Sequence, residues 1–563
     1  MRLLVIALAA LVGIAANVAF WYLPNRPADL SHVWTGGPLK SASFAPFRRG
    51  QSPLTQTFAT PAEIEGDLAA LQGKVAGVRT YTAREGLELV PKVAAKYGLT
   101  VMQGAWLGRD RTINEAEVAA VIHLANTYPD TIKRIIVGNE VLLRGELTSA
   151  EIEAQIRKVK QAVKQPVSYA DVWEFWLRHP ELAAEVDYIT VHFLPYWEDD
   201  PVGVAHSMEH IVAIHDIVAK AFPGKQIVIG EVGWPSAGRS REDAVPGRWM
   251  EAEFLNEFAL LAAQRGLDYN IVEAFDQPWK SAHEGTMGAN WGLVDANRQA
   301  KFPLAGPIVE NPNWQLALGG AVILGLLATL WSLRTPLPLA ASAAVALFAQ
   351  GLGAMLAVSA QFGLATWYDR DWYAAPALQF GLQAILAALL LRELVARLAK
   401  PAEPVPVLSP VVALGEWKIT TWRDRLLGIF VLLATYETLW LALRVDLPFL
   451  RAPLQEVPGK VVYWLHWMFN GRYRDFPIPE FVVPVAGFGM MLLILALFGR
   501  KPRAVSAEAP ASDRVLAALL ILGVVLLQWV ERFQNREAMY WGVMALLLAV
   551  LPALSLRRPA KQS

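Results

Sequence analysis

Two glutamates follow apolar segments in positions where a carboxylate could do chemistry. Glu140 lies in the run IIVGNEV, and Glu231 follows the apolar run QIVI by one residue and precedes a Gly-Trp-Pro-Ser turn. Cleavage of a glycosidic bond needs such a pair, an acid for the leaving oxygen and an anion for the sugar carbon, and a retaining enzyme holds the two roughly 5–5.5 Å apart. We expect the mutual field of the pair to raise the pKa of one partner, so that it stays a proton donor near neutral pH.

The elements that must position these glutamates form a repeating strand–helix pattern. Short apolar or β-branched runs predict strands at 43–47, 76–81, 99–104, 133–139, 166–170, 187–193, 225–230 and 269–275. Helical stretches between them include 61–74, 112–128, 148–164, 203–221 and 248–265. This alternation favours a closed parallel (β/α)8 TIM barrel. An open doubly wound sheet is the alternative, but no G-x-G-x-x-G follows the first strand.

Catalytic groups of such a barrel lie at the carboxyl ends of its strands. Glu140 ends the fourth predicted strand and Glu231 ends the seventh. Strands four and seven lie on opposing sides of an eight-stranded barrel, so the two side chains are expected to face each other across a substrate. An Asn-Glu pair alone is more typical of a helix start, and Gly-Trp-Pro-Ser alone is a turn. Their order on these two strands favours the catalytic interpretation.

The chain resembles glycoside hydrolase family 17, the retaining β-1,3-glucanases and β-1,3-glucanosyltransferases. The matching motifs, in order, are FAPFRRGQSP at 44–53, VRTY at 78–81, VGNEV at 137–141, EVGWPSAG at 231–238, AFDQPWK at 274–280 and NWGL at 290–293. The sequence departs from the family at Gln277-Pro278, where plant members commonly read Glu-Asn.

The resemblance implies a role for several residues. Glu140 would be the acid/base and Glu231 the nucleophile, and Asn139 would bond the 2-hydroxyl of the reacting sugar. Three further residues match family positions that line the cleft around the carboxylates: Tyr81, Lys280 and Glu284. Because the sequence differs at Gln277-Pro278, the polar contacts that plant enzymes make near the nucleophile cannot be transferred to this chain.

Aromatic residues near the expected loops are predicted to contact the sugar chain. Four tryptophans are expected to stack on a glucan, with plain packing as the alternative: Trp173, Trp176, Trp197 and Trp279. His192 ends strand six beside Tyr196, and both are predicted substrate contacts, although His192 could equally be a packed core imidazole.

A second histidine motif is not expected to bind a metal. HSMEH at 206–210 has the H-x-x-E-H spacing of some zinc peptidases, but it lies on a predicted helix away from the carboxyl ends of the strands. We therefore expect neither a metal site nor a cofactor.

The composition predicts that part of the chain lies in lipid. Hydrophobic residues make up 54% of the 563 residues. The mean hydropathy is +0.31. Both values are too apolar for an ordinary soluble enzyme.

The apolar segments divide the chain into three parts. Residues 1–25 are predicted to form an N-terminal transmembrane anchor, with a cleaved signal peptide as the alternative. Residues 40–305 would form the catalytic domain. Residues 313–563 would form an all-α, multi-span membrane domain of about seven helices, at 314–333, 338–366, 373–391, 426–443, 481–498, 515–530 and 539–556.

The distribution of basic residues predicts the orientation of this membrane domain. The segment 392–425 is rich in Lys and Arg and is therefore expected in the cytoplasm, although 444–480 also carries five basic residues and argues the other way. We expect a multi-pass protein of a bacterial inner (cytoplasmic) membrane, with its barrel facing the periplasm. Glu437 is an acid inside a predicted span, and 461–469 is predicted to be an interfacial helix. The 51 basic and 51 acidic residues give no field that would attract a nucleic acid.

Hydrolysis and glycosyl transfer share one covalent intermediate and differ in whether water or a sugar hydroxyl attacks it. Further membrane helices favour an enzyme that remodels, branches or cyclises β-glucan beside its export path, as membrane-embedded bacterial relatives of the family are similar in plan. The expected partners are β-1,3-glucan donor and acceptor, the lipid bilayer and a membrane glucan synthase or exporter. The alternatives are a retaining endo-β-1,3-glucan hydrolase and a non-catalytic glucan-binding or export scaffold.

Overall fold

The computed structural model divides into two compact units, which are Pro27–Val309 and the combination of Met1–Arg26 with Glu310–Ser563. The structure describes residues 1–303, 306–366, 374–400, 405–407, 410–415, 421–442, 473–500, 502–504 and 511–554. The predicted helix at 461–469 lies outside the described residues.

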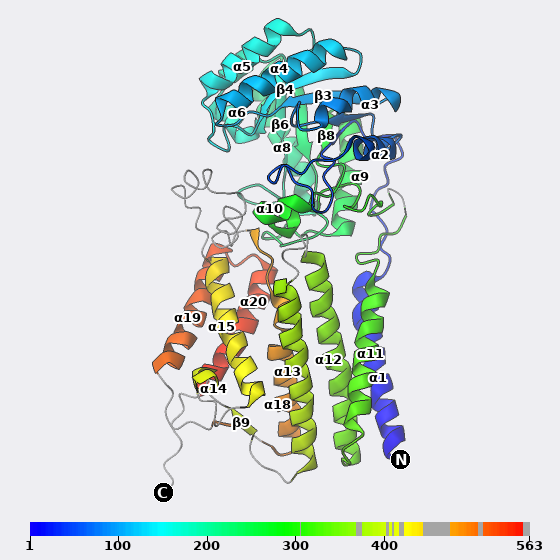
Figure 1. Ribbon diagram of the computed structural model, residues 1–563, viewed down its shortest axis with the longest axis vertical. Helices are drawn as coiled ribbons and strands as arrows, with labels where there is room; N and C mark the ends of the chain where they lie inside the picture. Colours follow the sequence, from blue (N-terminus) through cyan, green and yellow to red (C-terminus); the bar gives the residue numbers. More distant parts are fainter. Residues whose placement is uncertain are drawn as a thin grey trace. The chain divides into compact units, whose positions relative to one another are not determined.

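Unit Pro27–Val309 is built on a closed barrel of eight parallel strands, seen in the upper part of Figure 1. The strands are β1 Ala42–Ser43, β2 Gly77–Arg79, β3 Thr100–Ala105, β4 Ile132–Asn139, β5 Val167–Val172, β6 Ile189–His192, β7 Ile227–Val232 and β8 Asp268–Ile271. Each pairs with the next, and Ala42 of β1 pairs with Ile271 of β8 to close the barrel. The predicted barrel is confirmed. Its first and last strands are shorter than predicted, because the chain leaves the sheet after Ser43 and Ile271.

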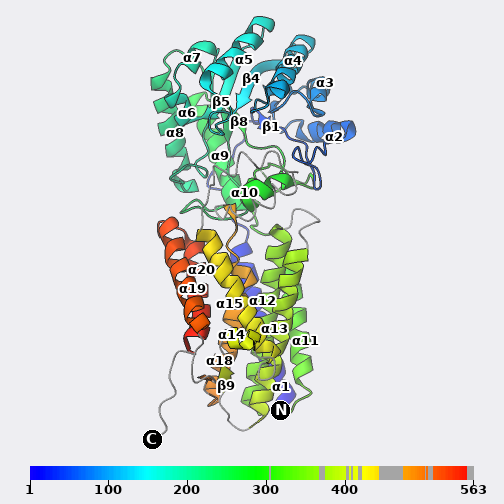
Figure 2. The same ribbon diagram turned by 60° about the vertical axis from the view of Figure 1, so that its left-hand side comes forward.

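Helices surround these strands on the outside, as Figure 2 shows. They are α2 Pro61–Leu71, α3 Val90–Lys96, α4 Arg111–Thr127, α5 Ser149–Ala162, α6 Trp173–Arg178, α7 Leu182–Glu185, α8 Val204–Ala221 and α9 Arg248–Arg265. A further helix, α10 Ser281–Gly288, follows β8 and lies at one end of the barrel (Figures 1 and 2). Capping residues in the local sequence determine where two of these helices begin. Thr60 and Glu63 form a capping box at α2, and Thr148 and Glu151 form another at α5, which satisfies backbone N–H groups that a helix start leaves free.

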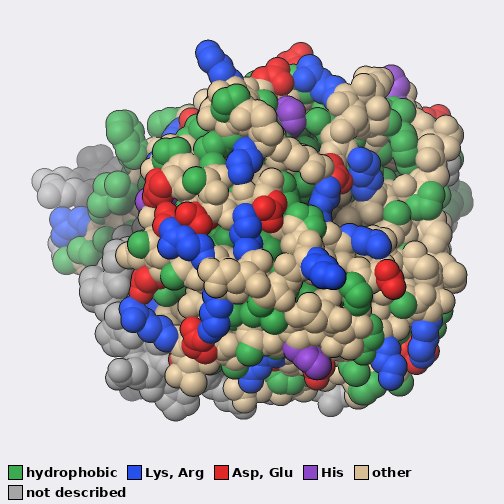
Figure 3. Space-filling view, turned by 90° about the horizontal axis from the view of Figure 1, so that it is seen from above, with side chains coloured by type: hydrophobic (Ala, Val, Ile, Leu, Met, Phe, Trp, Pro, Cys, Tyr) green, Lys and Arg blue, Asp and Glu red, His purple; other side chains and the backbone are tan. Residues whose placement is uncertain are grey.

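The outer surface of this barrel unit carries charges of both signs. Figure 3 shows basic and acidic side chains intermixed on the face seen from above. Several form ion pairs between neighbouring helices, such as Arg111 of α4 with Glu151 of α5 at 2.5 Å, and Arg157 of α5 with Glu185 of α7 at 2.9 Å. Exposed pairs of this kind contribute little to stability, so the barrel depends on its apolar interior.

The second unit is helical. Its helices are α1 Arg2–Tyr22, α11 Trp314–Ser332, α12 Leu339–Thr366, α13 Ala374–Ala399, α14 Pro410–Gly415, α15 Trp422–Ala442, α18 Phe488–Leu497, α19 Ala511–Val530 and α20 Arg536–Leu554. A short parallel pair, β9 Val405–Val407 and β10 Pro502–Ala504, accompanies them. Among the described residues, five helices are long and apolar enough to cross a membrane: Arg2–Asn25, Trp314–Ser332, Leu339–Thr366, Trp422–Ala442 and Ala511–Val530.

The N-terminal helix packs as a member of this helical unit. In Figures 1 and 2, α1 runs beside α11 and α12. Asn17 of α1 is buried, and its side-chain amide donates to the Gln350 backbone oxygen of α12 at 3.3 Å. Gly13 allows this approach, because a Cβ there would come within 2.7 Å of the Gln350 side chain. Helix α1 thus has polar and steric complementarity to a helix that lies far from it in the sequence.

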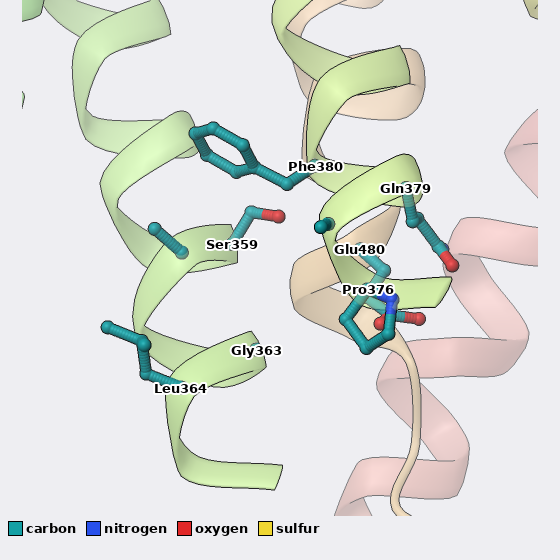
Figure 4. A pocket seen from close by; sticks show the side chains of 9 residues that line it. Ser359, Gly363, Leu364, Pro376, Gln379, Phe380 and Glu480 are labelled. Carbon is teal, nitrogen blue, oxygen red and sulfur yellow. The ribbon is translucent and has the colours of Figure 1, made fainter. Parts of the chain in front are cut away.

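A cavity of about 240 Å³ also lies within the helical unit. Figure 4 shows it between α12, which contributes Ser359 and Leu364, and α13, which contributes Pro376 and Phe380. Glu480 of the 3-10 helix η6 (Ile478–Glu480) completes its lining, which is otherwise mostly apolar.

The close packing of β3 against β2 provides a test of the barrel. A Cβ on Gly104 would lie 2.3 Å from the Thr80 carbonyl oxygen and 2.8 Å from Tyr81 backbone atoms. We expect Gly104→Ala to destabilise the barrel by about 1–3 kcal/mol, because backbone atoms cannot move aside.

Gly66→Ala is the matched control, since Gly66 is exposed in helix α2 and a Cβ there would meet nothing within 4 Å. This substitution should stabilise the helix by about 0.5–1 kcal/mol. Thermal unfolding followed by tryptophan fluorescence measures both variants, and equal midpoints would contradict the packing.

Candidate active site

The two predicted catalytic glutamates lie together at the carboxyl ends of their strands. Glu231 is part of β7, and Glu140 directly follows β4. One carboxylate oxygen of each glutamate and one ring nitrogen of His192 all lie within 4.8 Å of one another.

The backbone of Glu140 adopts a left-handed conformation, with a positive φ. Such a conformation costs a non-glycine residue about 1–3 kcal/mol. The backbone N–H of Glu140 donates to the Ala170 carbonyl of β5. The fold therefore stabilises a strained residue at the position where the two acids meet.

A buried arginine connects the two glutamate-bearing strands. The guanidinium of Arg79, on β2, is 1% exposed and donates through Nη1 to the Gly230 carbonyl at 2.7 Å and to Glu231 Oε1 at 3.2 Å. Its Nη2 donates to Asn139 Oδ1 at 2.6 Å. Arg79 thus places its positive charge beside Glu231, whose anionic form is the one that attacks a sugar carbon.

Glu231 also accepts a hydrogen bond from Tyr81 Oη at 2.8 Å. Burial raises the pKa of the Tyr81 phenol well above its usual value, and the charge of Glu231 raises it further, so Tyr81 remains a donor. The Tyr81 proton points at Glu231, so the hydroxyl of Ser43, 2.8 Å away, is the donor to Tyr81. Asn270 in turn donates to Ser43 at 2.8 Å. This chain of hydrogen bonds runs from Asn270 of β8 through Ser43 of β1 and Tyr81 to Glu231, and it holds the Glu231 carboxylate in position.

Glu140 accepts a hydrogen bond from Nδ1 of His192 at 2.9 Å. Burial acts to raise the pKa of Glu140, but the hydrogen bond from His192 and the charges of His192, Arg144 and Arg79 outweigh it, so this pKa lies below the ordinary value. The sequence-based expectation that the mutual field of the pair raises the pKa of the acid is therefore wrong for Glu140 in the free protein. The pKa is lowered because His192, Arg144 and Arg79, which are far from one another in the sequence, all lie near Glu140 in the fold.

A third carboxylate group lies in the loop after β8. Glu273 is fully buried and accepts from Lys280 Nζ at 2.9 Å. Burial raises the pKa of Glu273 to about 7 against the opposing charge of Lys280. Burial also raises the pKa of Glu284 to about 7, and the charges of Glu140 and Glu231 add to this increase. The pKa of Lys280 is raised by Glu273 and Glu284 despite its burial. Lys280 and Glu284 thus share one electrostatic cluster with the catalytic pair.

Comparison with known proteins identifies this unit. Residues 42–292 match the family model of the BtgE/BtgC glycoside hydrolase domain. The barrel is a glycoside hydrolase domain. The predicted resemblance to a family of β-1,3-glucan-active enzymes is thereby confirmed.

Individual relatives match less than half of the chain. A glucan 1,3-beta-glucosidase of Arthroderma benhamiae is 28% identical over 258 residues, which are 43% of this chain and 83% of that protein. The glucan 1,3-beta-glucosidase BGL2 of Candida albicans is 25% identical over 264 residues, 43% of this chain and 85% of that protein. Among solved structures, a glycoside hydrolase family 17 beta-1,3-glucanosyltransferase from Rhizomucor miehei has a TM-score of 0.42 at 25% identity, covering 48% of this chain and 98% of that one.

Two of the predicted sugar contacts in the glycoside hydrolase domain belong to its core. Trp176 is 1% exposed, and its indole N–H donates to the Thr190 carbonyl at 2.8 Å. Tyr196 is fully buried, its hydroxyl donates to the Arg239 carbonyl, and the edges of neighbouring indoles meet its ring. The predictions that Trp176 and Tyr196 bind substrate are wrong, because neither ring has a free face. His192, 1% exposed and set between the two glutamates, is likewise no open sugar contact.

The other predicted aromatic contacts are half-buried. Trp173 begins helix α6 and donates to both carboxylate oxygens of Glu198 at 3.3 Å. Trp197 stacks on Trp291 at 6.3 Å between centroids with an interplanar angle of 9°. Trp279 donates to Gln277 Oε1 at 2.9 Å. These three tryptophans remain predicted glucan contacts.

Sequence reasoning missed two important residues of the glycoside hydrolase domain. Arg79 lies within the motif VRTY, where only the tyrosine was assigned a role. Glu273 lies within the apolar run 269–275, which was assigned to the last strand. A charged residue inside an apolar, β-forming run was the available signal in both cases, because such a residue must find a partner once it is buried.

The arrangement fits acid–base chemistry better than metal binding. Among the described residues, Glu140, His192 and Glu231 have ligand atoms close enough to hold a cation. However, Glu231 Oε1 already accepts from Arg79 and Tyr81, and Glu140 Oε1 already accepts from His192. In the motif HSMEH, His206 lies near Glu209 at 3.8 Å, whereas His210 lies near Glu198 at 3.2 Å.

Two tryptophans of helix α6 allow a matched test of these assignments. We expect Trp176→Ala to destabilise the domain by about 3–5 kcal/mol, because it empties a buried site. Trp173→Ala should leave the unfolding temperature close to that of the wild type and weaken binding of a β-1,3-glucan oligosaccharide several-fold, since an aromatic stack contributes on the order of 1 kcal/mol. Thermal unfolding and calorimetric titration of the full-length protein distinguish the two. If Trp173→Ala binds the oligosaccharide with unchanged affinity, Trp173 is not a glucan contact.

Proposed function

We propose that this protein is a retaining β-1,3-glucan glucanosyltransferase that works through a covalent glycosyl-enzyme. The observation that carries the proposal is the approach of Glu140 and Glu231, whose carboxylate oxygens come within 4.8 Å of each other. Retaining glycosidases hold their carboxyl groups roughly 5–5.5 Å apart, whereas inverting ones need roughly 6.5–9.5 Å to admit a water. The choice of β-1,3-glucan is supported by the names of the relatives.

In the first step, Glu231 attacks the anomeric carbon while Glu140 protonates the departing glycosidic oxygen. Hydrogen bonds from Arg79 and Tyr81 hold the Glu231 carboxylate in place. The side-chain oxygen of Asn139 accepts a hydrogen bond from Arg79. The amide N–H groups of Asn139 can therefore donate to the sugar 2-hydroxyl. In the second step, Glu140 takes the proton of an acceptor hydroxyl, and the sugar leaves Glu231 for that acceptor.

Transfer requires an acceptor sugar held beside the intermediate, because dissolved water is far more concentrated than any glucan. The half-buried tryptophans Trp173, Trp197 and Trp279 are the candidates for holding that acceptor. A retaining endo-hydrolase is the second candidate function, since it uses the same intermediate and the relatives are named as glucosidases. An inactive glucan-binding or export scaffold is less favoured, because both carboxylates and their supporting hydrogen bonds are in place.

The helical unit supports a location in a bacterial inner membrane, with the glycoside hydrolase domain on the periplasmic side. Five apolar helices among its described residues are long enough to span a bilayer, and Lys and Arg concentrate in 392–425, which favours a cytoplasmic position for that segment. An enzyme in this position would act on glucan as it leaves the cell. A membrane glucan synthase or exporter is the partner that this location suggests.

The products formed from a defined linear β-1,3-glucan oligosaccharide test the function. We expect the purified full-length protein to yield chains both longer and shorter than the substrate, detected by mass spectrometry, because each transfer extends one chain at the expense of another. Only shorter products would assign the hydrolase function. If the substrate is unchanged, the non-catalytic scaffold would be the remaining function.

Variants of the two glutamates serve as controls in the same assay. Glu231→Gln should abolish turnover, since an amide cannot attack the sugar carbon. Glu140→Gln should slow turnover of the natural oligosaccharide by about 10²–10⁴-fold but spare the first step on a donor with an activated leaving group, which needs no proton. Azide should partly restore Glu140→Ala by replacing the acceptor. Equal losses on both donors in both variants would contradict the assignment of the two roles.

Reporter fusions test the orientation. A reporter that is active only outside the cytoplasm should be active when fused after residue 305 and inactive when fused near residue 410, because the positive cluster 392–425 is expected to stay inside. The opposite pattern would place the glycoside hydrolase domain in the cytoplasm, away from exported glucan.

A further inference from the structure

His192 lies between the two catalytic carboxylates. Its Nδ1 donates to Glu140 Oε1 at 2.9 Å, and its Nε2 lies 3.7 Å from Glu231 Oε1. The residue is 1% exposed, and Nε2 has no hydrogen-bond partner among the described residues. A buried polar atom without a partner is costly, so one that is directed at a catalytic carboxylate calls for an explanation in the chemistry.

The surrounding strands are shaped to admit this imidazole. His192 ends β6, which pairs with β7 at Glu231. Gly230 precedes the nucleophile, and a Cβ there would lie 3.1 Å from Cδ2 and 3.2 Å from Nε2 of His192. It would also lie 2.6 Å from the Thr190 side chain. The glycine in Ile-Gly-Glu therefore leaves the space that the imidazole ring occupies.

Charged groups from several elements surround the ring. Acidic groups approach from the ends of several strands and from α10, and basic groups from β2 and the segments after β4 and β8. The charged groups around His192 and its two glutamate neighbours are Glu140, Glu231, Asp171, Glu273 and Glu284, against Arg79, Arg144 and Lys280. An imidazolium in this position places Nδ1–H on Glu140 and directs Nε2–H at Glu231. The two catalytic carboxylates that face its ring nitrogens would balance the charge of such an imidazolium.

We propose that His192 is a positioning residue that stores the catalytic proton for Glu140, an inference that rests on the proposed retaining function. In the free enzyme one proton is shared between Nδ1 of His192 and the carboxylate of Glu140. During the first step that proton passes to Glu140 and from Glu140 to the glycosidic oxygen, as the bond from the anomeric carbon to that oxygen breaks and the bond to Glu231 forms. In the second step the acceptor hydroxyl gives its proton to Glu140, which shares it again with Nδ1.

This proton sharing resolves the conflict between the position of Glu140 and its role. The contacts of Glu140 with positive neighbours favour its ionised form, whereas a general acid must supply a proton near neutral pH. Two strongly interacting groups lose their protons as a pair. An imidazole ordinarily holds its proton to higher pH than a carboxyl, with ordinary pKa values of about 6.5 and about 4.3.

The pH dependence of His192→Asn tests the proposal. Asparagine keeps an N–H donor for Glu140 but has no titrating group. In the wild type, kcat/KM on an unactivated oligosaccharide should follow a bell-shaped pH profile with an acid limb and a higher-pH limb, and the higher-pH limb should report loss of the shared proton. In His192→Asn the higher-pH limb should move about two units toward acid, the difference between the two ordinary pKa values, while the acid limb stays in place. Near neutral pH this shift lowers kcat/KM by about 100-fold.

A donor with a dinitrophenolate leaving group is the matched control, because its departure needs no proton. The first step on this donor should proceed in His192→Asn within a few-fold of the wild-type rate, and thermal unfolding should show that the variant is folded. His192→Ala, which lacks the donor N–H as well, should show the same shift of the higher-pH limb.

Several results would overturn the proposal. A higher-pH limb at the wild-type position in both His192 variants would show that the proton is not stored on the ring. A loss that is equal on both donors and at every pH would indicate a structural role, and a raised KM with an unchanged pH profile would indicate a sugar contact. Absence of glucan turnover in the wild type would instead refute the proposed function.

Discussion

The burial of the Arg79 guanidinium constrains the rest of the active site. Removing a guanidinium from water costs several kcal/mol unless charged and polar acceptors surround it. Arg79 finds them on two other strands, in the Gly230 carbonyl and Glu231 carboxylate of β7 and in the Asn139 amide of β4. Satisfying this one charge therefore sets the relative positions of both glutamates, because Asn139 directly precedes Glu140. A closed barrel makes the contact possible, since its strands surround a common interior.

The charges around the catalytic pair are distributed unequally, and this inequality separates the roles of chemically identical side chains. Glu231 accepts from Arg79 and Tyr81, whereas Glu140 accepts from a histidine that can itself bind and release a proton. Glu273, by contrast, is buried deeply enough that its pKa rises to about 7 despite Lys280. Environments that differ in this way allow one fold to provide a nucleophile and a proton donor at the same pH.

The helical unit is held together by a different principle. Small residues let helices approach closely. At Gly353 of α12, for example, a Cβ would lie 2.2 Å from the Ala321 carbonyl oxygen of α11. A buried amide pair, Asn17 and Gln350, adds a directional contact between α1 and α12. Such contacts specify which helices are neighbours, which apolar surfaces alone do not, because one leucine-rich face packs on another with little preference.

The sequence by itself determined the barrel, the order of its strands and the two glutamates at the ends of β4 and β7. These features depend on local patterns, namely the alternation of β-forming and helical segments and the position of an acid just after an apolar run. Only the tertiary structure decided which polar and aromatic side chains meet at the site. Trp173 and Trp176 are the same residue type in the same short helix, and positions three apart lie on one side of a helix, yet Trp173 is half-buried and Trp176 lies in the core. Their tertiary partners differ, since the Trp173 indole donates to Glu198 and the Trp176 indole to the Thr190 carbonyl of β6. The lowered pKa of Glu140 likewise arises from positive groups of which two come from other strands. Burial and long-range charge are sums over residues far apart in the chain, and no local pattern contains them.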